Sequence, residues 1–88
     1  MTVQVSISTT PNENALKFTV NKKVIESGYK TFNNLEEAKE HPLAAKLFEN
    51  HGLASVFLMP EFITVTKKPE SEWSSLQEKI VKDIQAIL

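Results

Sequence analysis

Two histidines, His41 and His51, are the side chains best suited to acid–base catalysis or metal binding, because imidazole titrates near neutral pH and is the commonest metal ligand. They flank a segment with the pattern of a helix, and ten residues at about 1.5 Å each would separate them by roughly 15 Å. One metal ion cannot be reached from both, since its bonds to nitrogen are about 2 Å long. We expect instead that His41 caps the start of this helix and that His51 lies at its negative end.

The absence of cysteine removes several classes of chemistry. The chain can form no disulfide, thiolate nucleophile, zinc–thiolate site or redox pair, and it can bind no cofactor through cysteine. Gly28 and Gly52 are the only glycines, which excludes a glycine-rich phosphate loop or a dinucleotide fingerprint. No serine lies in a nucleophile-elbow context. We therefore expect a binding protein and not an enzyme.

Carboxylates offer another route to a metal. The acidic side chains are ten glutamates and Asp83, and most of the glutamates lie on polar faces or in loops beside lysines. Carboxylate and imidazole groups could nevertheless bind iron directly and weakly, and the candidate ligands are Glu40, His41 and Glu49. A direct association with iron is thus the first alternative to a protein-binding role.

Helix starts offer a second alternative. Free backbone N–H groups at the start of a helix favour anions, so a phosphorylated or carboxylate ligand could bind near Pro42 or Ser71. The chain would then be a small regulatory module that recognises an anionic ligand.

The charge balance argues against nucleic acid as a partner, and the short apolar runs argue against a membrane-spanning helix. Ten basic residues against eleven acidic ones give a net charge of −1, which creates no basic field for a nucleic-acid backbone. The most apolar run, residues 56–59, stops at Pro60, whereas a membrane-spanning helix needs about 20 apolar residues.

Residues 1–6 lack the features of a signal peptide, so we expect a cytoplasmic protein. We expect residues 1–88 to form a single domain and a monomer.

Five segments have the alternation or the β-branched and aromatic content of strands: residues 3–7, 16–20, 29–32, 53–59 and 62–66. Residues 9–14 carry Pro and Asn, whose turn chemistry could join the first two as an antiparallel pair. Pro60 and Glu61 separate the last two in the same way. We expect residues 29–32 to form a short edge strand.

Two segments have helical periodicity. Pro42 suits a first helical turn, and Gly52 suits a left-handed residue past the helix end. The apolar stripe between them is Leu43, Ala44, Leu47 and Phe48. A second stripe steps by three, four, four and three through Trp73, Leu76, Ile80, Ile84 and Ile87.

The helix caps follow from side chains that accept backbone hydrogen bonds. Ser71 is the natural cap of the second helix, with Ser75 as a later alternative. Asn34 resembles a further cap, but Pro42 limits any helix there to a short turn. The predicted fold class is therefore α+β in the order ββαββα, a mainly antiparallel sheet with two helices on one face. We expect Trp73 to lie in the core.

Several stretches, taken together and in order, resemble the N-terminal domain of Nfu/NifU-like iron–sulfur scaffold proteins. They are residues 10–18 (TPNENALKF), 41–44 (HPLA), 47–48 (LF), 56–57 (VF) and 60–67 (PEFITVTK), followed by Trp73 and Leu76. The resemblance covers nearly the whole chain. In the usual Nfu architecture a second domain carries a Cys-x-x-Cys motif for the cluster, and this chain has no such motif.

The resemblance implies an accessory protein-interaction module in iron–sulfur cluster assembly or delivery, which is not itself a thiolate ligand of the cluster. The partner would be an iron–sulfur carrier or an apo-protein client. The candidate partner-binding residues are Pro11, Asn12, Asn14, Lys17, Met59, Glu61 and Phe62. Plain turn-forming chemistry is the alternative role of the first three.

Overall fold

The computed structural model describes residues 3–50 and 52–88, so the expectation for His51 lies outside the described residues. Along the chain the elements are β1 (Val5–Thr9), β2 (Ala15–Val20), β3 (Lys30–Phe32), α1 (Leu35–Ala38), α2 (Pro42–Leu47), β4 (Leu53–Leu58), β5 (Phe62–Lys67) and α3 (Trp73–Ile87). The predicted α+β class is confirmed, and so is the short strand expected within residues 29–32. None of the described helices is both long and apolar enough to cross a membrane.

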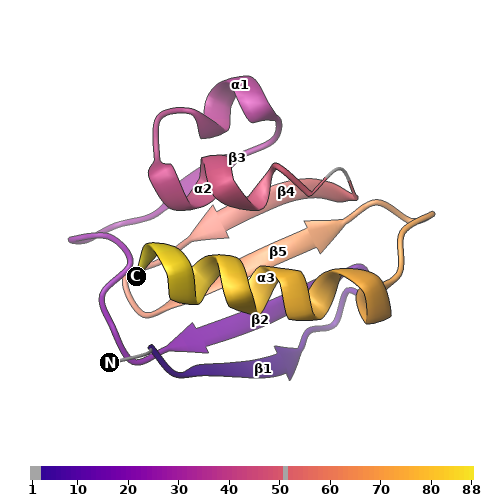
Figure 1. Cartoon of the computed structure of the whole chain (residues 1–88), viewed down its shortest axis with the longest axis horizontal. Helices are drawn as coiled ribbons and strands as arrows, with labels where there is room; N and C mark the ends of the chain where they lie inside the picture. The colour runs from indigo at the N-terminus through magenta and orange to yellow at the C-terminus, as the bar shows by residue number, and fades with distance from the viewer. Residues whose placement is uncertain (1–2, 51) are drawn as a thin grey trace.

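The five strands form one sheet in the order β1-β2-β5-β4-β3, and every neighbouring pair is antiparallel (Figure 1). The two predicted hairpins, β1 with β2 and β4 with β5, are both present. They are joined through β2 and β5, which lie side by side in the centre although about 40 residues of chain separate them. As a result, β1 and β3 are the two edges of the sheet.

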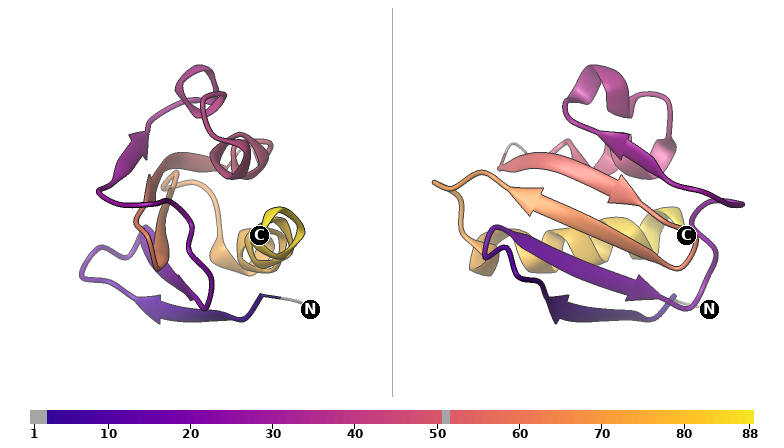
Figure 2. Two further views of the ribbon diagram at one scale, coloured as in Figure 1. Left: turned by 90° about the vertical axis from the view of Figure 1, so that its left-hand side faces the viewer. Right: turned by 180° about the vertical axis from the view of Figure 1, so that it is seen from behind.

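Both longer helices, α2 and α3, lie on the same face of the sheet, as predicted (Figure 2, left). Alternate strand residues point toward them, because successive side chains of a strand point to opposite faces. The largest fully buried side chains are Phe18, Leu43, Leu47, Val56, Leu58, Ile63, Val65, Ile80 and Ile84. The core therefore lies between this face and the two helices.

The capping expectations for α1 and α2 are confirmed. Oδ1 of Asn34 accepts a 2.8 Å hydrogen bond from the N–H of Glu37 at the start of α1. Nδ1 of His41 accepts one of 3.2 Å from the N–H of Leu43 at the start of α2. α1 is a single turn, as expected from the proline that follows it.

Two expectations about Gly52 and Ser71 were wrong. Gly28 is the only described residue with a positive φ, at 72°, so Gly52 is not left-handed. Its lack of a side chain serves close packing, because a Cβ there would lie 2.7 Å from Oγ of Ser71. α3 begins after Glu72 with no side-chain cap, so Ser71 lies one residue before the cap position, in a turn where its N–H donates to the carbonyl of Lys68.

Two hydrophobic positions also differ from prediction. Ile87 keeps its place in the helical stripe but is 40% exposed, because α3 ends there and no further turn covers it. The first strand is shifted by two residues toward the C-terminus, so that Val3 is buried ahead of it. Ile7 belongs to this edge strand and is 38% exposed.

Candidate functional site

The structure separates the predicted partner-binding residues into two groups. One belongs to the β1–β2 loop (residues 10–14) and the other to the β4–β5 turn (residues 59–61) with Phe62, whereas Lys17 lies between them on β2. Because Ala15 pairs with Thr66 at one end of β2, the loop and the turn lie at opposite ends of the sheet (Figure 1). Six strand residues at about 3.3 Å each place roughly 20 Å between them. They are therefore two surfaces and not one.

The polar side chains of the β1–β2 loop are bonded within the protein. Oγ1 of Thr10 donates to the carbonyl of Ala15 at 3.0 Å, and Oδ1 of Asn12 accepts from the N–H of Asn14 at 2.9 Å. Oδ1 of Asn14 accepts a 3.0 Å hydrogen bond from Nζ of Lys67, a lysine that is only 9% exposed. These bonds are the local turn chemistry that Asn and Thr provide. Within the described contacts, Asn12 stabilises the loop and Asn14 accepts from the ammonium group of Lys67.

Trp73 packs against the core, as predicted, and also fastens this loop. Its ring centroid lies 6.5 Å from that of Phe18, with the ring planes tilted by 58°. Its Nε1–H donates to the carbonyl of Glu13 at 3.2 Å. The half-buried indole therefore covers the edge of the core and satisfies its polar end at the loop.

The β4–β5 turn is held by the last residue of β2 and by the chain that follows it. The carbonyl of Glu61 accepts from the N–H of Val20 at 3.0 Å, and that of Pro60 accepts from the N–H of Val24 at 2.8 Å. These two hydrogen bonds fix the backbone of the turn and therefore the positions from which its side chains project. A shallow pocket of about 270 Å³ is lined by Met59, Pro60, Glu61 and Phe62.

The face of the sheet opposite α2 and α3 is not covered by any of the described helices (Figure 2). We call it the open face, and its central side chains are Lys17, Thr19, Phe57, Phe62 and Thr64. Each of these residues alternates along its strand with residues that are buried on the other face.

A cation and three aromatic rings lie in a row across the open face. Nζ of Lys17 is 4.4 Å from the ring centroid of Phe62, which is cation–π geometry. The ring of Phe57 on β4 lies 5.6 Å from that of Tyr29, which directly precedes β3 and is 68% exposed. Phe57 pairs with Thr64, two residues beyond Phe62 on β5, so the two contacts lie next to each other. Of the predicted residues, the structure brings together Lys17 and Phe62.

Sequence reasoning did not select Tyr29 and Phe57, although a signal for Phe57 was present. Phe57 lies between the buried Val56 and Leu58. Both helices were expected on one face, so the out-of-phase aromatic had to point to the uncovered face. Tyr29 directly precedes β3, and its contact with Phe57 depends on the pairing of β3 with β4, which the sequence pattern does not report.

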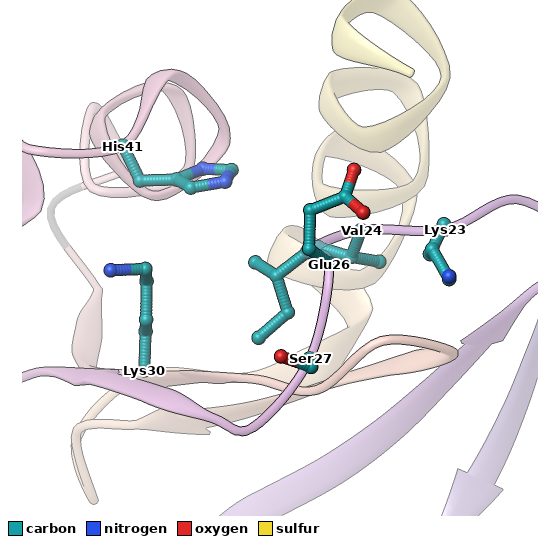
Figure 3. A pocket seen from close by; sticks show the side chains of 7 residues that line it. Lys23, Val24, Glu26, Ser27, Lys30 and His41 are labelled. Carbon is teal, nitrogen blue, oxygen red and sulfur yellow. The ribbon is translucent and has the colours of Figure 1, made fainter.

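His41 lies at a pocket of about 400 Å³ lined also by Lys23, Val24, Ile25, Glu26, Ser27 and Lys30. Figure 3 shows its ring projecting from the start of α2 toward the segment that holds Val24 and Glu26. The pKa of His41 is lowered, first by burial and then by the charge of Lys30. The backbone hydrogen bond with Val24 and the carboxylate of Glu40 oppose this shift. The neutral imidazole is thus favoured, and its Nδ1 is occupied by the helix cap.

The two glutamates of the alternative iron site form ion pairs with lysines. Glu40 forms a 3.4 Å ion pair with Lys30, and Glu49 forms a 3.5 Å ion pair with Lys46 at the far end of α2. No group of three or more His, Asp or Glu that could hold a metal ion is found among residues 3–50 and 52–88. The structure therefore does not bring Glu40, His41 and Glu49 together.

The proposed anion sites are also limited. α2 has six residues and its second N–H is already bonded to His41. At the start of α3 the N–H of Ser71 is bonded to a backbone carbonyl, and its hydroxyl lies against Gly52. The start of α3 has no side-chain cap, so its first N–H groups are not used in that way, and an anion site there stays a prediction.

Comparison with curated proteins gives consistent relatives. The chain is 43% identical over 76 residues to the human protein named "NFU1 iron-sulfur cluster scaffold homolog, mitochondrial", which covers 85% of this chain and 30% of that protein. It is 35% identical over 79 residues to "NifU-like protein 5, mitochondrial" of Arabidopsis thaliana, and the aligned region covers 90% of this chain and 29% of that protein. The chain thus spans less than a third of the length of these relatives.

Solved structures share the fold. The solution structure of a NifU-like protein from Saccharomyces cerevisiae superposes with a TM-score of 0.85 at 26% identity, covering 97% of this chain and 77% of that one. A crystal structure of a Staphylococcus aureus protein superposes with a TM-score of 0.81 at 24% identity over 96% of this chain and 99% of that one, and this likeness shows the fold alone. The family model described as "Scaffold protein Nfu/NifU N terminal" matches residues 5–88. The chain therefore belongs to the Nfu/NifU N-terminal scaffold protein family.

Proposed function

We propose that this chain is a protein-docking module in iron–sulfur cluster assembly or delivery. It binds a cluster carrier or an apo-protein client through its open face. It acts by binding and supplies no thiolate ligand, since it contains no cysteine.

The observation that carries this proposal is the row formed by Lys17, Phe62, Phe57 and Tyr29 on an uncovered sheet face. Aromatic side chains on a rigid support are the usual anchors of protein interfaces, because they bury much area and lose little conformational entropy. The Lys17 ammonium at one end of the row favours a partner that carries a carboxylate beside an apolar patch.

The family supports the iron–sulfur part of the proposal. The human relative is named as an iron–sulfur cluster scaffold homolog, and the chain covers less than a third of it. The cytoplasmic location expected from residues 1–6 stays a prediction, and the word "mitochondrial" in the names of these relatives makes that organelle the alternative. Fractionation of cells that express the tagged protein would distinguish the two.

The proposal can be tested by titrating the ¹⁵N-labelled chain with a separate Cys-x-x-Cys scaffold domain, in apo and cluster-loaded forms, and with apo-protein clients. We expect chemical-shift changes confined to the open face with at least one of these proteins. Absence of localised shifts with all of them, or shifts confined to the helical face, would contradict the proposal.

Variants sharpen this test. Phe57→Ser and Lys17→Glu should each weaken binding by about tenfold or more, because they remove an anchor or reverse the charge beside it. Leu35→Ser and Lys82→Glu are matched controls, since these residues are exposed and lie away from the open face. Equal weakening by the control variants would show that the effect is not specific to the open face.

A further inference from the structure

The edge strand β1 presents unused backbone hydrogen-bonding groups. Along β1, Gln4 and Asn21 form a hydrogen-bonded pair, because the N–H of Asn21 donates to the carbonyl of Gln4 at 3.3 Å. Hydrogen-bonded and non-hydrogen-bonded pairs alternate in an antiparallel ladder. With the register of β1 and β2, the backbone groups of Val5, Ile7 and Thr9 therefore point away from the sheet. Three N–H and three C=O groups face outward along this edge.

A hollow lies between this edge and α3. It measures about 390 Å³, and its lining residues are Ile7, Ser74, Gln77, Glu78 and Val81. Ile7 pairs with Phe18, whose side chain is buried on the helical face, so the side chain of Ile7 also points to that face and lines the hollow. The backbone groups of Ile7 point outward along the edge. Ile7 is 38% exposed and Val81 is half-buried, so an apolar side chain placed here would be covered on two sides.

The two edges of the sheet differ in how they are protected. Proteins usually block an exposed edge with lysine, proline, a bulge or a very short strand. β3 has three residues and contains Lys30. β1 has five residues, with neither charge nor proline, and its register with β2 is regular. Four of its five residues are exposed, so this edge is open to pairing with another strand.

The occupant can be chosen by charge. Glu78 is the only charged residue among those that line the hollow. If a second copy paired with β1 around Ile7, its own Glu78 would approach this one, and two like charges would face each other. A partner segment that carries a lysine or arginine would instead complement Glu78.

We propose that β1 and α3 form a docking groove for an extended segment of another protein, which adds to the sheet as a sixth strand. The segment places an aliphatic side chain in the hollow beside Ile7 and Val81 and a basic side chain near Glu78. This is β-strand addition, in which backbone hydrogen bonds supply affinity and a side-chain pocket supplies specificity. The groove and the open face are different parts of the molecule. The groove proposal therefore does not depend on docking at the open face.

The probes for this proposal are synthetic hexapeptides that alternate threonine with isoleucine or valine and carry one lysine. Matched versions replace the lysine by glutamate or place N-methyl groups along one backbone edge. We expect the lysine peptide to slow amide hydrogen exchange at Val5, Ile7 and Thr9, whose N–H groups point outward. Ser6 and Ser8 should change little, because their N–H groups already bond to β2. Slowing at all five positions, or at none, would overturn the proposal.

Two variants test the groove itself. Ile7→Pro removes an outward N–H, which an edge strand tolerates, and should weaken the lysine peptide about tenfold or more. Glu78→Lys should reverse the preference from the lysine peptide to the glutamate peptide, whereas Glu70→Lys, an exposed change outside the hollow, should not. A Glu78→Lys variant with unchanged preference contradicts the proposed contact, and circular dichroism confirms that each variant is folded.

Two further outcomes are informative. Protection of Val5, Ile7 and Thr9 that rises with protein concentration, without peptide and with a dimer in sedimentation equilibrium, would assign the groove to a second copy and overturn the proposal. Phe57→Ser should leave peptide binding unchanged. Failure of open-face docking and failure of groove docking can therefore be told apart.

Discussion

Oδ1 of Asn14 accepts a 3.0 Å hydrogen bond from Nζ of Lys67, and 53 positions of sequence separate the two residues. The ammonium group is largely buried, and its other described acceptor is the carbonyl of Lys68 at 3.4 Å. The pair ties the loop before β2 to the last residue of β5, at the end of the two central strands. Asn14 is therefore a structural residue as well as a predicted contact residue.

Replacing Asn14 with alanine should lower the free energy of unfolding by about 1–3 kcal/mol, because it leaves a buried charge with a weaker partner. Asn12→Ala should cost less, since Asn12 is exposed and bonds only to a loop N–H. Urea denaturation measures both values. In a Lys67→Met background the cost of Asn14→Ala should become smaller, and an unchanged cost would show that the two side chains are not coupled.

Trp73→Phe should loosen the β1–β2 loop while keeping the core folded. The change keeps an aromatic ring beside Phe18 but removes the Nε1–H that donates to the carbonyl of Glu13. We expect a loss of about 1 kcal/mol in stability and faster amide exchange in residues 12–15. Ser74→Ala, one residue further along α3, serves as the control. Exchange rates that rise equally across the whole sheet would contradict a local role.

Gly52→Ala should destabilise the protein by about 1–3 kcal/mol through a steric clash. The added Cβ would lie 2.7 Å from Oγ and 3.1 Å from Cβ of Ser71. Combining it with Ser71→Gly removes these contacts, so the cost of Gly52→Ala, measured by thermal unfolding, should fall. Gly28→Ala is the contrasting case, because its cost of about 1 kcal/mol comes from a positive φ and Ser71→Gly should not relieve it.

His41 should make stability depend on pH below about 6.5, the ordinary pKa of histidine. Burial and Lys30 lower the pKa of His41 in the folded protein, so the unfolded chain takes up a proton at a higher pH than the folded one. The stability that neutral His41 contributes is complete above pH 6.5 and is lost as the pH falls from there toward the folded pKa.

The measurement is urea denaturation between pH 5 and 8 in a His51→Asn background, so that a single histidine titrates. His41→Asn keeps a side-chain oxygen for the helix cap and should remove the dependence. His41→Ala should remove it too and cost about 1 kcal/mol at pH 8 through loss of the cap. A slope that persists in both variants would assign the pH dependence to carboxylates instead.

The periodicity of the sequence predicted the elements well. Alternation or β-branched and aromatic content located the five strands to within about two residues, and a three-and-four stripe located α3. The caps at Asn34 and His41 were also correct, because a cap depends on only three or four neighbouring residues. Gly52 and Ser71 were misassigned because their roles come from packing against each other, which local sequence does not record.

The sequence by itself determined the α+β class, the two hairpins, the common face of the helices and the absence of thiolate chemistry, since hydrophobic period and residue type carry this information. Only the tertiary structure decided that β2 lies beside β5. That pairing places the β1–β2 loop and the β4–β5 turn at opposite ends, joins Asn14 to Lys67 and leaves β1 as an edge. A period of two reports which face of a strand is buried, but it does not report which strand is the neighbour.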